Sequence, residues 1–190
     1  MVGSAPTFLK FFLMYGVMMK WTKETYLRLL LPFEKRDHRV RVLTQSRDKA
    51  KNMLAFYADA RTYQQRLDDV ATPWGWTVEY DHMISNNLSV VKATVTILGV
   101  PKSDYGDSEI SFDRHTPDKS ILAASGQAFK RACSAFGLGR YLYATGQVWV
   151  DAIDGKKFLT SRQESEQIDK IYSAKILPYK NKVSKALGGI

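Results

Sequence analysis

Alternating apolar and polar residues in the middle of the chain predict two neighbouring strands. Apolar side chains recur at every second position over residues 76–80 and again over residues 91–97. A period of two is typical of a strand that buries one face. Asn86 and Asn87 lie between the two segments, and asparagine tolerates the positive φ that a tight hairpin requires. The pattern therefore predicts an antiparallel hairpin.

A third strand is expected over residues 109–112, with Ile110 and Phe112 facing the core. The Gly-Val-Pro segment 99–101 is expected to end the second strand, because glycine and proline interrupt regular pairing. The three strands together form a predicted antiparallel meander.

A long helix is expected after the meander. Thr116 supplies a capping hydroxyl, Pro117 suits the first helical turn, and Gly137 is the expected left-handed cap. At about 100° per residue, this helix divides into three strips. The apolar stripe, expected to pack on the sheet, holds Leu122, Gly126, Phe129, Cys133 and Phe136. A strip of mostly small residues permits close approach by another backbone, such as that of a neighbouring subunit: Ile121, Ala124, Ala128, Ala132 and Ala135. The polar strip presents Lys130 and Arg131 beside Gln127 and Ser134.

Weaker patterns predict the remaining elements. They are helices over 22–31, 58–70 and 161–174, a strand over 148–150 and a turn over 153–156. The alternating segment 39–43 is either an edge strand or part of a solvated basic loop. The lysine-rich tail from Lys170 is expected to be flexible, because Pro178 and two terminal glycines disfavour order, and to attract DNA weakly.

The predicted fold class is therefore α+β: a three-stranded antiparallel β-meander packed on a long helix, with N- and C-terminal appendages. We expect a core domain over 20–160 and a C-terminal helix with a basic tail over 161–190. Residues 1–19 form an uncertain N-terminal extension. Its apolar part is too short to span a bilayer and lacks a clear signal-peptide cleavage site. Either a later methionine is the true start, or the extension packs as an oligomer contact.

Composition adds a basic charge to this picture. The chain has 190 residues, 45% of them hydrophobic, and a net charge of +9. This favours a globular protein with an anionic partner, nucleic acid first and a membrane surface second, although a merely basic soluble protein fits the charge too. Cys133 is the one cysteine, which excludes an intrachain disulfide and indicates a reducing, cytoplasmic location. A buried structural thiol is the expected role of Cys133.

The basic charge is concentrated where acids are missing. Residues 119–150 contain four lysines or arginines and no aspartate or glutamate. The chain has no phosphate-binding Gly-x-x-x-x-Gly-Lys loop, and its three histidines are scattered, so neither a nucleotide-hydrolysing motor nor a histidine metal cluster is expected. One alternative remains in a group of acids that a metal-dependent nuclease would use: Asp104, Asp107, Glu109 and Asp113. Acids on a loop and strand edge are the more ordinary interpretation.

The string from Gln127 to Tyr143, with Lys-Arg-Ala before Phe-Gly on a helix, resembles the Rad52 family of single-strand annealing proteins. Together with Val148-Trp149-Val150 and the upstream segment 57–76, it is most similar to the bacterial branch called DNA damage response protein A (DdrA). The resemblance covers roughly residues 26–158. It implies no enzyme activity and no cofactor or metal. It also implies a ring or arc of subunits that holds single-stranded DNA in a shared basic groove.

The resemblance also implies which residues contact DNA. The family's basic pair matches Lys130 and Arg131, and a groove arginine matches Arg61. A position tied to a second DNA site corresponds to Lys102. Arg140 is a further DNA-binding candidate and is alternatively a structural cation that stacks on a neighbouring tyrosine.

The expected function is ATP-independent binding of single-stranded DNA, with annealing or end protection in DNA repair and recombination, by a bacterial or phage-encoded protein. Two alternatives stay open: a metal-dependent end-processing nuclease and a duplex- or RNA-binding module. Trp74 and Trp76 are expected in the core rather than as base-stacking platforms.

Overall fold

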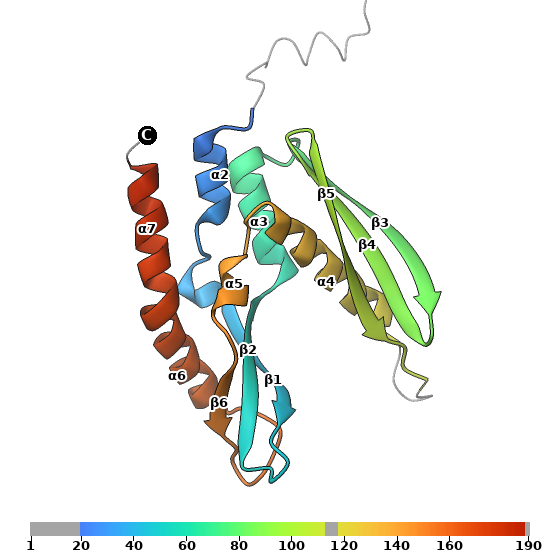
Figure 1. Ribbon diagram of the computed structural model, residues 1–190, viewed down its shortest axis with the longest axis vertical. Coiled ribbons are helices and arrows are strands. Elements are labelled where there is room, and N and C mark those ends of the chain that lie inside the picture. Colours follow the sequence, from blue (N-terminus) through green and yellow to red (C-terminus); the bar gives the residue numbers. More distant parts are fainter. Residues whose placement is uncertain (1–19, 113–117, 189–190) are drawn as a thin grey trace, which may run out of the picture.

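A computed structural model describes residues 20–112 and 118–188, and it contains two antiparallel three-stranded sheets joined by a long helix (Figure 1). One sheet has the order β3-β4-β5, formed by Trp76–Ser85, Leu88–Ile97 and Val100–Glu109. The other has the order β1-β2-β6, formed by His38–Gln45, Lys51–Ala58 and Val148–Asp151. The helices are α2 (Lys23–Leu30), η1 (Lys35–Asp37), α3 (Ala60–Ala71), α4 (Ser120–Ala135), α5 (Tyr141–Ala144), α6 (Ser161–Ile171), η2 (Tyr172–Ile176) and α7 (Leu177–Leu187).

The predicted α+β class and the meander packed on a long helix are confirmed. Asn86 and Asn87 adopt positive φ angles of 48° and 63° and turn β3 into β4, as expected. The predicted third strand is wrong in position. β5 begins at Val100, immediately after a tight turn, and ends before Ile110, while Phe112 is 73% exposed. Proline is tolerated at the start of β5 because this strand lies at the edge of its sheet.

Helix α4 packs on β4 and β5 through its small residues. Ala124, Ala128 and Ala132 are fully buried, and the backbone of Ala124 and Ala128 faces Gly106 of β5. A Cβ atom at Gly106 would lie 2.3 Å from the carbonyl oxygen of Ala124 and 2.5 Å from the amide nitrogen of Ala128. The alanine strip therefore admits the backbone of its own sheet. The expectation that it faces a neighbouring subunit is wrong.

The apolar stripe of α4 is correct only in its second half. Phe129, Cys133 and Phe136 are buried, but Leu122 is 70% exposed. Periodicity alone cannot tell which side of a helix approaches a sheet when one side carries alanines and the other carries larger residues. The predicted helix start at residues 116–117 lies outside the described residues. In the described part, the Asp118 carboxylate accepts a hydrogen bond of 3.0 Å from the amide of Ser120.

The second sheet contains a strand that the periodicity did not predict. Residues 51–58 form β2, so the helix expected from residue 58 begins at Ala60 instead. β2 carries apolar residues on both faces (Met53, Leu54, Ala55, Phe56), which hides the period of two. The edge strand expected over 39–43 is confirmed as part of β1, and the strand expected over 148–150 is confirmed as part of β6.

The C-terminal segment is helical through residue 187, so the expected flexibility of this tail is wrong for its described part. Thr160 and Gln163 form a capping box that starts α6. Pro178 lies in the first turn of α7, where a missing backbone N–H is tolerated. Two lysines tie the segment to the core: Lys175 donates to the Thr145 carbonyl oxygen, and Lys180 donates to Glu34. No helix among the described residues is long and apolar enough to cross a membrane.

A buried polar network joins β1, α5 and the segment that follows α2. The Nδ1 atom of His38 lies 2.9 Å from the Glu34 carbonyl oxygen, which can only accept, so Nδ1 carries the hydrogen. The Nε2 atom lies 2.8 Å from the Tyr141 hydroxyl oxygen, and in the neutral ring it accepts from that hydroxyl. The same hydroxyl oxygen accepts from the Phe33 amide at 3.1 Å. Burial lowers the pKa of His38 and so favours this neutral form.

Candidate nucleic-acid interface

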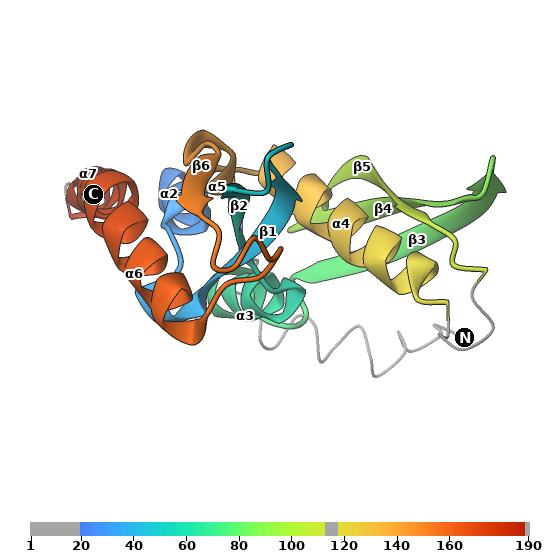
Figure 2. The same cartoon turned by 90° about the horizontal axis from the view of Figure 1, so that it is seen from below.

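The paired cations of α4 point toward different sheets. The Lys130 ammonium lies 5.7 Å from the centroid of the Tyr57 ring on β2. Arg131 Nη1 instead donates a hydrogen bond of 2.8 Å to the Tyr105 carbonyl oxygen on β5. Because α4 lies between the two sheets (Figures 1 and 2), neighbouring residues on this helix serve different surfaces.

Arg131 takes part in closing the free edge of the meander. On β5, the amide of Asp107 donates to Gln127 Oε1 at 2.8 Å, and the carbonyl of Tyr105 accepts from Arg131. These two side chains of α4 satisfy backbone groups that an edge strand otherwise leaves unpaired. The Arg131 side chain is still 41% exposed. Since guanidinium has five N–H donors, Arg131 can also contact an anion.

Lys130 lies in a more confined environment. Its pKa is lowered from the ordinary lysine value, first by desolvation and then by the positive charge of Arg41, while Asp59 acts in the opposite direction. Arg41 contacts the same tyrosine as Lys130, and its guanidinium carbon lies 5.9 Å from the centroid of the Tyr57 ring. Two cations from distant parts of the chain are thus held next to one aromatic ring.

Lys102 and Arg140 both bind the C-terminal end of α4. Lys102 Nζ donates to the Ala135 carbonyl oxygen at 2.8 Å and lies 4.8 Å from the centroid of the Phe136 ring. Arg140 donates to the carbonyl oxygens of Ser134 at 2.8 Å and Ala135 at 3.0 Å. Cations at this position satisfy unpaired carbonyls and oppose the negative end of the helix dipole. A structural role for Arg140 was expected from tyrosine stacking, but its hydrogen bonds go to the helix end.

Arg61 lies on the exposed side of the first turn of α3. It lines an open hollow together with Arg36, Gln65 and Asp69. Arg66, in the same hollow, is occupied with structure, since it donates to the carbonyl oxygens of Arg28, Leu31 and Pro32 at the end of α2. The structure therefore places Arg61 in a hollow that Lys130 does not line.

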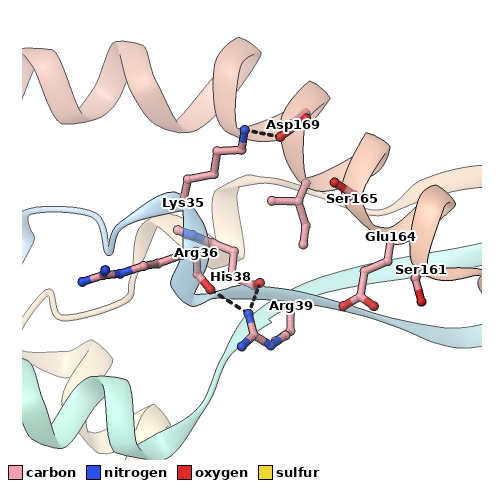
Figure 3. Close-up of a pocket in the computed structure, with 9 residues that line it drawn as sticks. Lys35, Arg36, His38, Arg39, Ser161, Glu164, Ser165 and Asp169 are labelled. Atoms are coloured by element: carbon pink, nitrogen blue, oxygen red, sulfur yellow. Dashed lines mark hydrogen bonds and ion pairs between the residues drawn. The ribbon is translucent and has the colours of Figure 1, made fainter.

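A second hollow, between residues 35–39 and α6, has opposite charges facing each other (Figure 3). Lys35 pairs with Asp169, and the Arg39 guanidinium donates to the carbonyl oxygens of Arg36 and His38. Glu164 lines the same hollow. Its basic groups are largely satisfied within the molecule, so we do not place an anion there.

The acids that suggested a nuclease do not converge in the part of the chain that is described. No group of three or more histidine, cysteine, aspartate or glutamate side chains there could hold a metal ion. Asp107 lies 4.0 Å from Arg131 and faces a cation instead. Asp113 is outside the described residues. Cys133 is buried, as expected, and burial raises the pKa of its thiol.

Sequence reasoning missed Arg41 and Tyr57 as neighbours of Lys130. The one signal for them was the alternation in residues 39–43, which predicts outward-facing arginines without saying what they face. The expectation for the tryptophans was correct for Trp76, which is partly buried and donates to Asp68 at 2.8 Å. It was wrong for Trp74, whose side chain is 90% exposed.

Comparisons with known proteins show which family the chain resembles. A profile described as Rad52/22 family double-strand break repair protein matches residues 24–157, which include all five candidate cations. A protein of Deinococcus deserti named single-stranded DNA-binding protein DdrA is 35% identical over 112 residues, covering 59% of this chain and 53% of the relative. The protein of the same name from Deinococcus radiodurans is 33% identical over 113 residues, covering 58% of this chain and 50% of the relative. The chain thus spans about half the length of the curated relatives it matches.

Proposed function

This chain belongs to the Rad52/22 family of double-strand break repair proteins, and from that premise we propose that it binds single-stranded DNA with little sequence preference. Both similar Deinococcus proteins carry single-stranded DNA binding in their names. The Lys-Arg string that carried the resemblance lies inside the matched range.

The observation that carries this proposal is the position of Lys130. Its cation lies on an acid-free segment, where α4 meets the second sheet, and Arg41 adds a second positive charge beside it. Phosphate contacts by lysine and arginine supply most of the affinity in sequence-independent binding. Lys130, Arg131 and Arg61 are the proposed DNA contacts. Lys102 and Arg140 are proposed to contribute through the charge they keep near the end of α4.

We further propose that binding leads to annealing of complementary strands, or to protection of their ends, without ATP. Cations neutralise the repulsion between two phosphate backbones, so that bases facing outward can pair. Such a protein needs no cofactor and no covalent chemistry. A place in the bacterial cytoplasm, at the chromosome, fits this role.

We propose a ring or arc of subunits as the active form. The alanine strip of α4 does not support such an assembly, because its buried alanines pack on the meander of the same subunit. The remaining support is the family resemblance and the small number of phosphates that one copy could cover. Light scattering tests the idea: a particle of 21.6 kDa at micromolar concentration would refute it.

Fluorescence anisotropy with a labelled single strand, measured over a salt series, tests the binding. The affinity should fall with salt, with a log–log slope of about −0.7 for each phosphate contact. Lys130→Ala should weaken binding, whereas Lys182→Ala, which removes an exposed cation from α7, should not. A flat salt response refutes the proposal. Stronger binding of RNA or duplex, or shortening of the strand that requires magnesium, would favour the alternative functions.

A further inference from the structure

One side of strand β3 carries exposed apolar residues that no described element covers. Alternate residues share one face of a strand, so five residues of β3 face the side on which α4 packs: Trp76, Val78, Tyr80, His82 and Ile84. Helix α4 packs mainly on β4 and β5 rather than on β3. Trp76 is partly buried, and its ring centroid lies 6.2 Å from that of Phe129. Tyr80 and Ile84 lie farther along the strand and are 46% and 68% exposed.

The flank of α4 that lies beside β3 is also exposed at its start. Leu122 and Phe129 are seven residues apart and share one side of the helix. Phe129 is buried, whereas Leu122 is 70% exposed. The hydroxyl oxygens of Ser120 and Ser89 lie 2.8 Å apart, and Ser89 pairs with Ile84, so the start of α4 lies near the exposed end of β3. We call the exposed apolar residues at this end the α4–β3 surface: Tyr80, Ile84 and Leu122.

The described chain begins close to the other end of β3. Trp21 Nε1 donates a hydrogen bond of 2.9 Å to the Ile97 carbonyl oxygen, and Ile97 lies opposite Trp76, the first residue of β3. The Trp21 ring also stacks on Phe136, which follows α4, with the two ring centroids 5.7 Å apart. The residues before Trp21 are therefore attached on the α4 side of the meander, beside the start of β3.

The segment before Trp21 has the composition and the length to cover the α4–β3 surface. Residues 8–19 contain one charged residue, Lys10, and are otherwise apolar or aromatic apart from Gly16. From Trp76 to Ile84, β3 spans about 26 Å, and twelve residues extend up to about 40 Å. The family match begins at residue 24, so family membership assigns no role to this segment. Apolar residues gathered in this way usually mark a contact.

We propose that residues 8–19 pack on the α4–β3 surface of their own subunit and cover Tyr80, Ile84 and Leu122. This proposal does not depend on DNA binding. Trp21 fixes the segment beside the surface, so its effective concentration there is about millimolar, well above that of a second copy at micromolar concentration. The Lys10 stem can lie along the apolar surface while its ammonium stays in water. The exposed half of the apolar stripe of α4 thereby gains a partner within the same chain.

Thiol labelling of the full chain tests this packing, because the native Cys133 is buried and burial raises the pKa of its thiol. Leu122→Cys and Ile84→Cys each place a thiol on the α4–β3 surface. Ser184→Cys is the matched control at an exposed position of α7. If residues 8–19 cover the surface, the first two variants should react with a maleimide at least about tenfold more slowly than Ser184→Cys.

A charged pair in the segment tests whether the segment provides the protection. Phe11→Glu combined with Phe12→Glu should restore fast labelling of Leu122→Cys, because two carboxylates resist burial on an apolar surface. A second chain, with Phe12→Cys and Leu122→Cys together, should form a disulfide within one chain under mild oxidation. Its product should therefore run as a monomer on a denaturing gel.

Each other outcome overturns the proposal. Equal labelling rates for Leu122→Cys and Ser184→Cys would show that the surface is open. Slow labelling that persists in the Phe11→Glu, Phe12→Glu chain and grows with protein concentration would show that a second copy covers the surface. Disulfide-linked dimers would show that the segment docks on a neighbour. Fast labelling in solution, with flotation on anionic phospholipid vesicles that the two glutamates abolish, would assign the segment to a membrane surface.

Discussion

Replacing Arg131 and Lys130 one at a time should separate a structural role from a binding role. Arg131→Ala removes the hydrogen bond of 2.8 Å to the Tyr105 carbonyl oxygen and reopens the edge of β5. Lys130→Ala removes a cation–π contact with Tyr57 but also ends the repulsion from Arg41. The two variants each delete one charge from the same helix, so they form a matched pair.

The expected cost of Arg131→Ala follows from its bonding and exposure. Hydrogen bonds to charged groups contribute about 1.5–3 kcal/mol when well shielded. The side chain of Arg131 is 41% exposed, and its 4.0 Å approach to the half-exposed Asp107 adds little. We therefore expect a loss of about 1 kcal/mol, and a fall of about 2–4 °C in the melting temperature for a chain of this length. For Lys130→Ala, the contact and the repulsion nearly cancel, so the change should stay below about 0.5 kcal/mol.

The assay is thermal and urea unfolding of both variants beside DNA binding by anisotropy. Arg131→Lys keeps the charge but cannot reproduce the planar fork, so it should be intermediate in stability. Gln127→Ala removes the other side chain bonded to the edge of β5 and should also lower the melting temperature. Equal melting temperatures for Arg131→Ala and Lys130→Ala would refute the role of Arg131 in closing the edge of the sheet. Unchanged DNA binding by Lys130→Ala would refute its place in the interface.

Three more predictions concern the scaffold. Burial lowers the pKa of His38, so the unfolded chain binds a proton more readily than the folded protein does, and the stability contributed by neutral His38 is present above about pH 6.5 and is lost as the pH falls below that value. His38→Gln should therefore flatten this part of a profile of melting temperature against pH, whereas His82→Gln should not. Gly106→Val should destabilise the protein by more than about 2 kcal/mol, because its side chain would meet the backbone of α4 at Ala124 and Ala128, whereas Gly126→Ala, which opens into free space, should be neutral or stabilising in urea unfolding. Lys102→Ala and Arg140→Ala should each cost about 0.5–1.5 kcal/mol through the C-terminal carbonyls of α4, and a melting temperature unchanged in both would contradict that role.

Local patterns were sufficient where a segment's own chemistry decides its conformation. The alternation over residues 91–97, the Asn86-Asn87 turn and the left-handed Gly137 at φ 96° all follow from a few neighbouring residues. The Lys-Arg string was specific enough to indicate the family. These features survive in any tertiary arrangement, because backbone preferences and hydrophobic periods act over a few residues.

Patterns failed where a strand owes its place to partners far away in the chain. Strand β2 has apolar residues on both faces and shows no period, and it is a strand because β1 and β6 pair with it. Strand β5 is largely polar and begins with Val-Pro, yet it pairs along its full length with β4. Pairing of this kind depends on the register of neighbouring strands, which a local window does not contain.

The candidate site divides in the same way. The sequence by itself determined that Lys130 and Arg131 lie on the polar side of a helix in an acid-free segment. Only the tertiary structure decided that they diverge, with Arg131 bonded to β5 and Lys130 placed beside Tyr57 and Arg41. The physical reason is the close approach of α4 to Gly106, which sets the rotation of the helix between the two sheets. A helical period specifies which residues share a side of the helix, but the packing against the sheets specifies what each side meets.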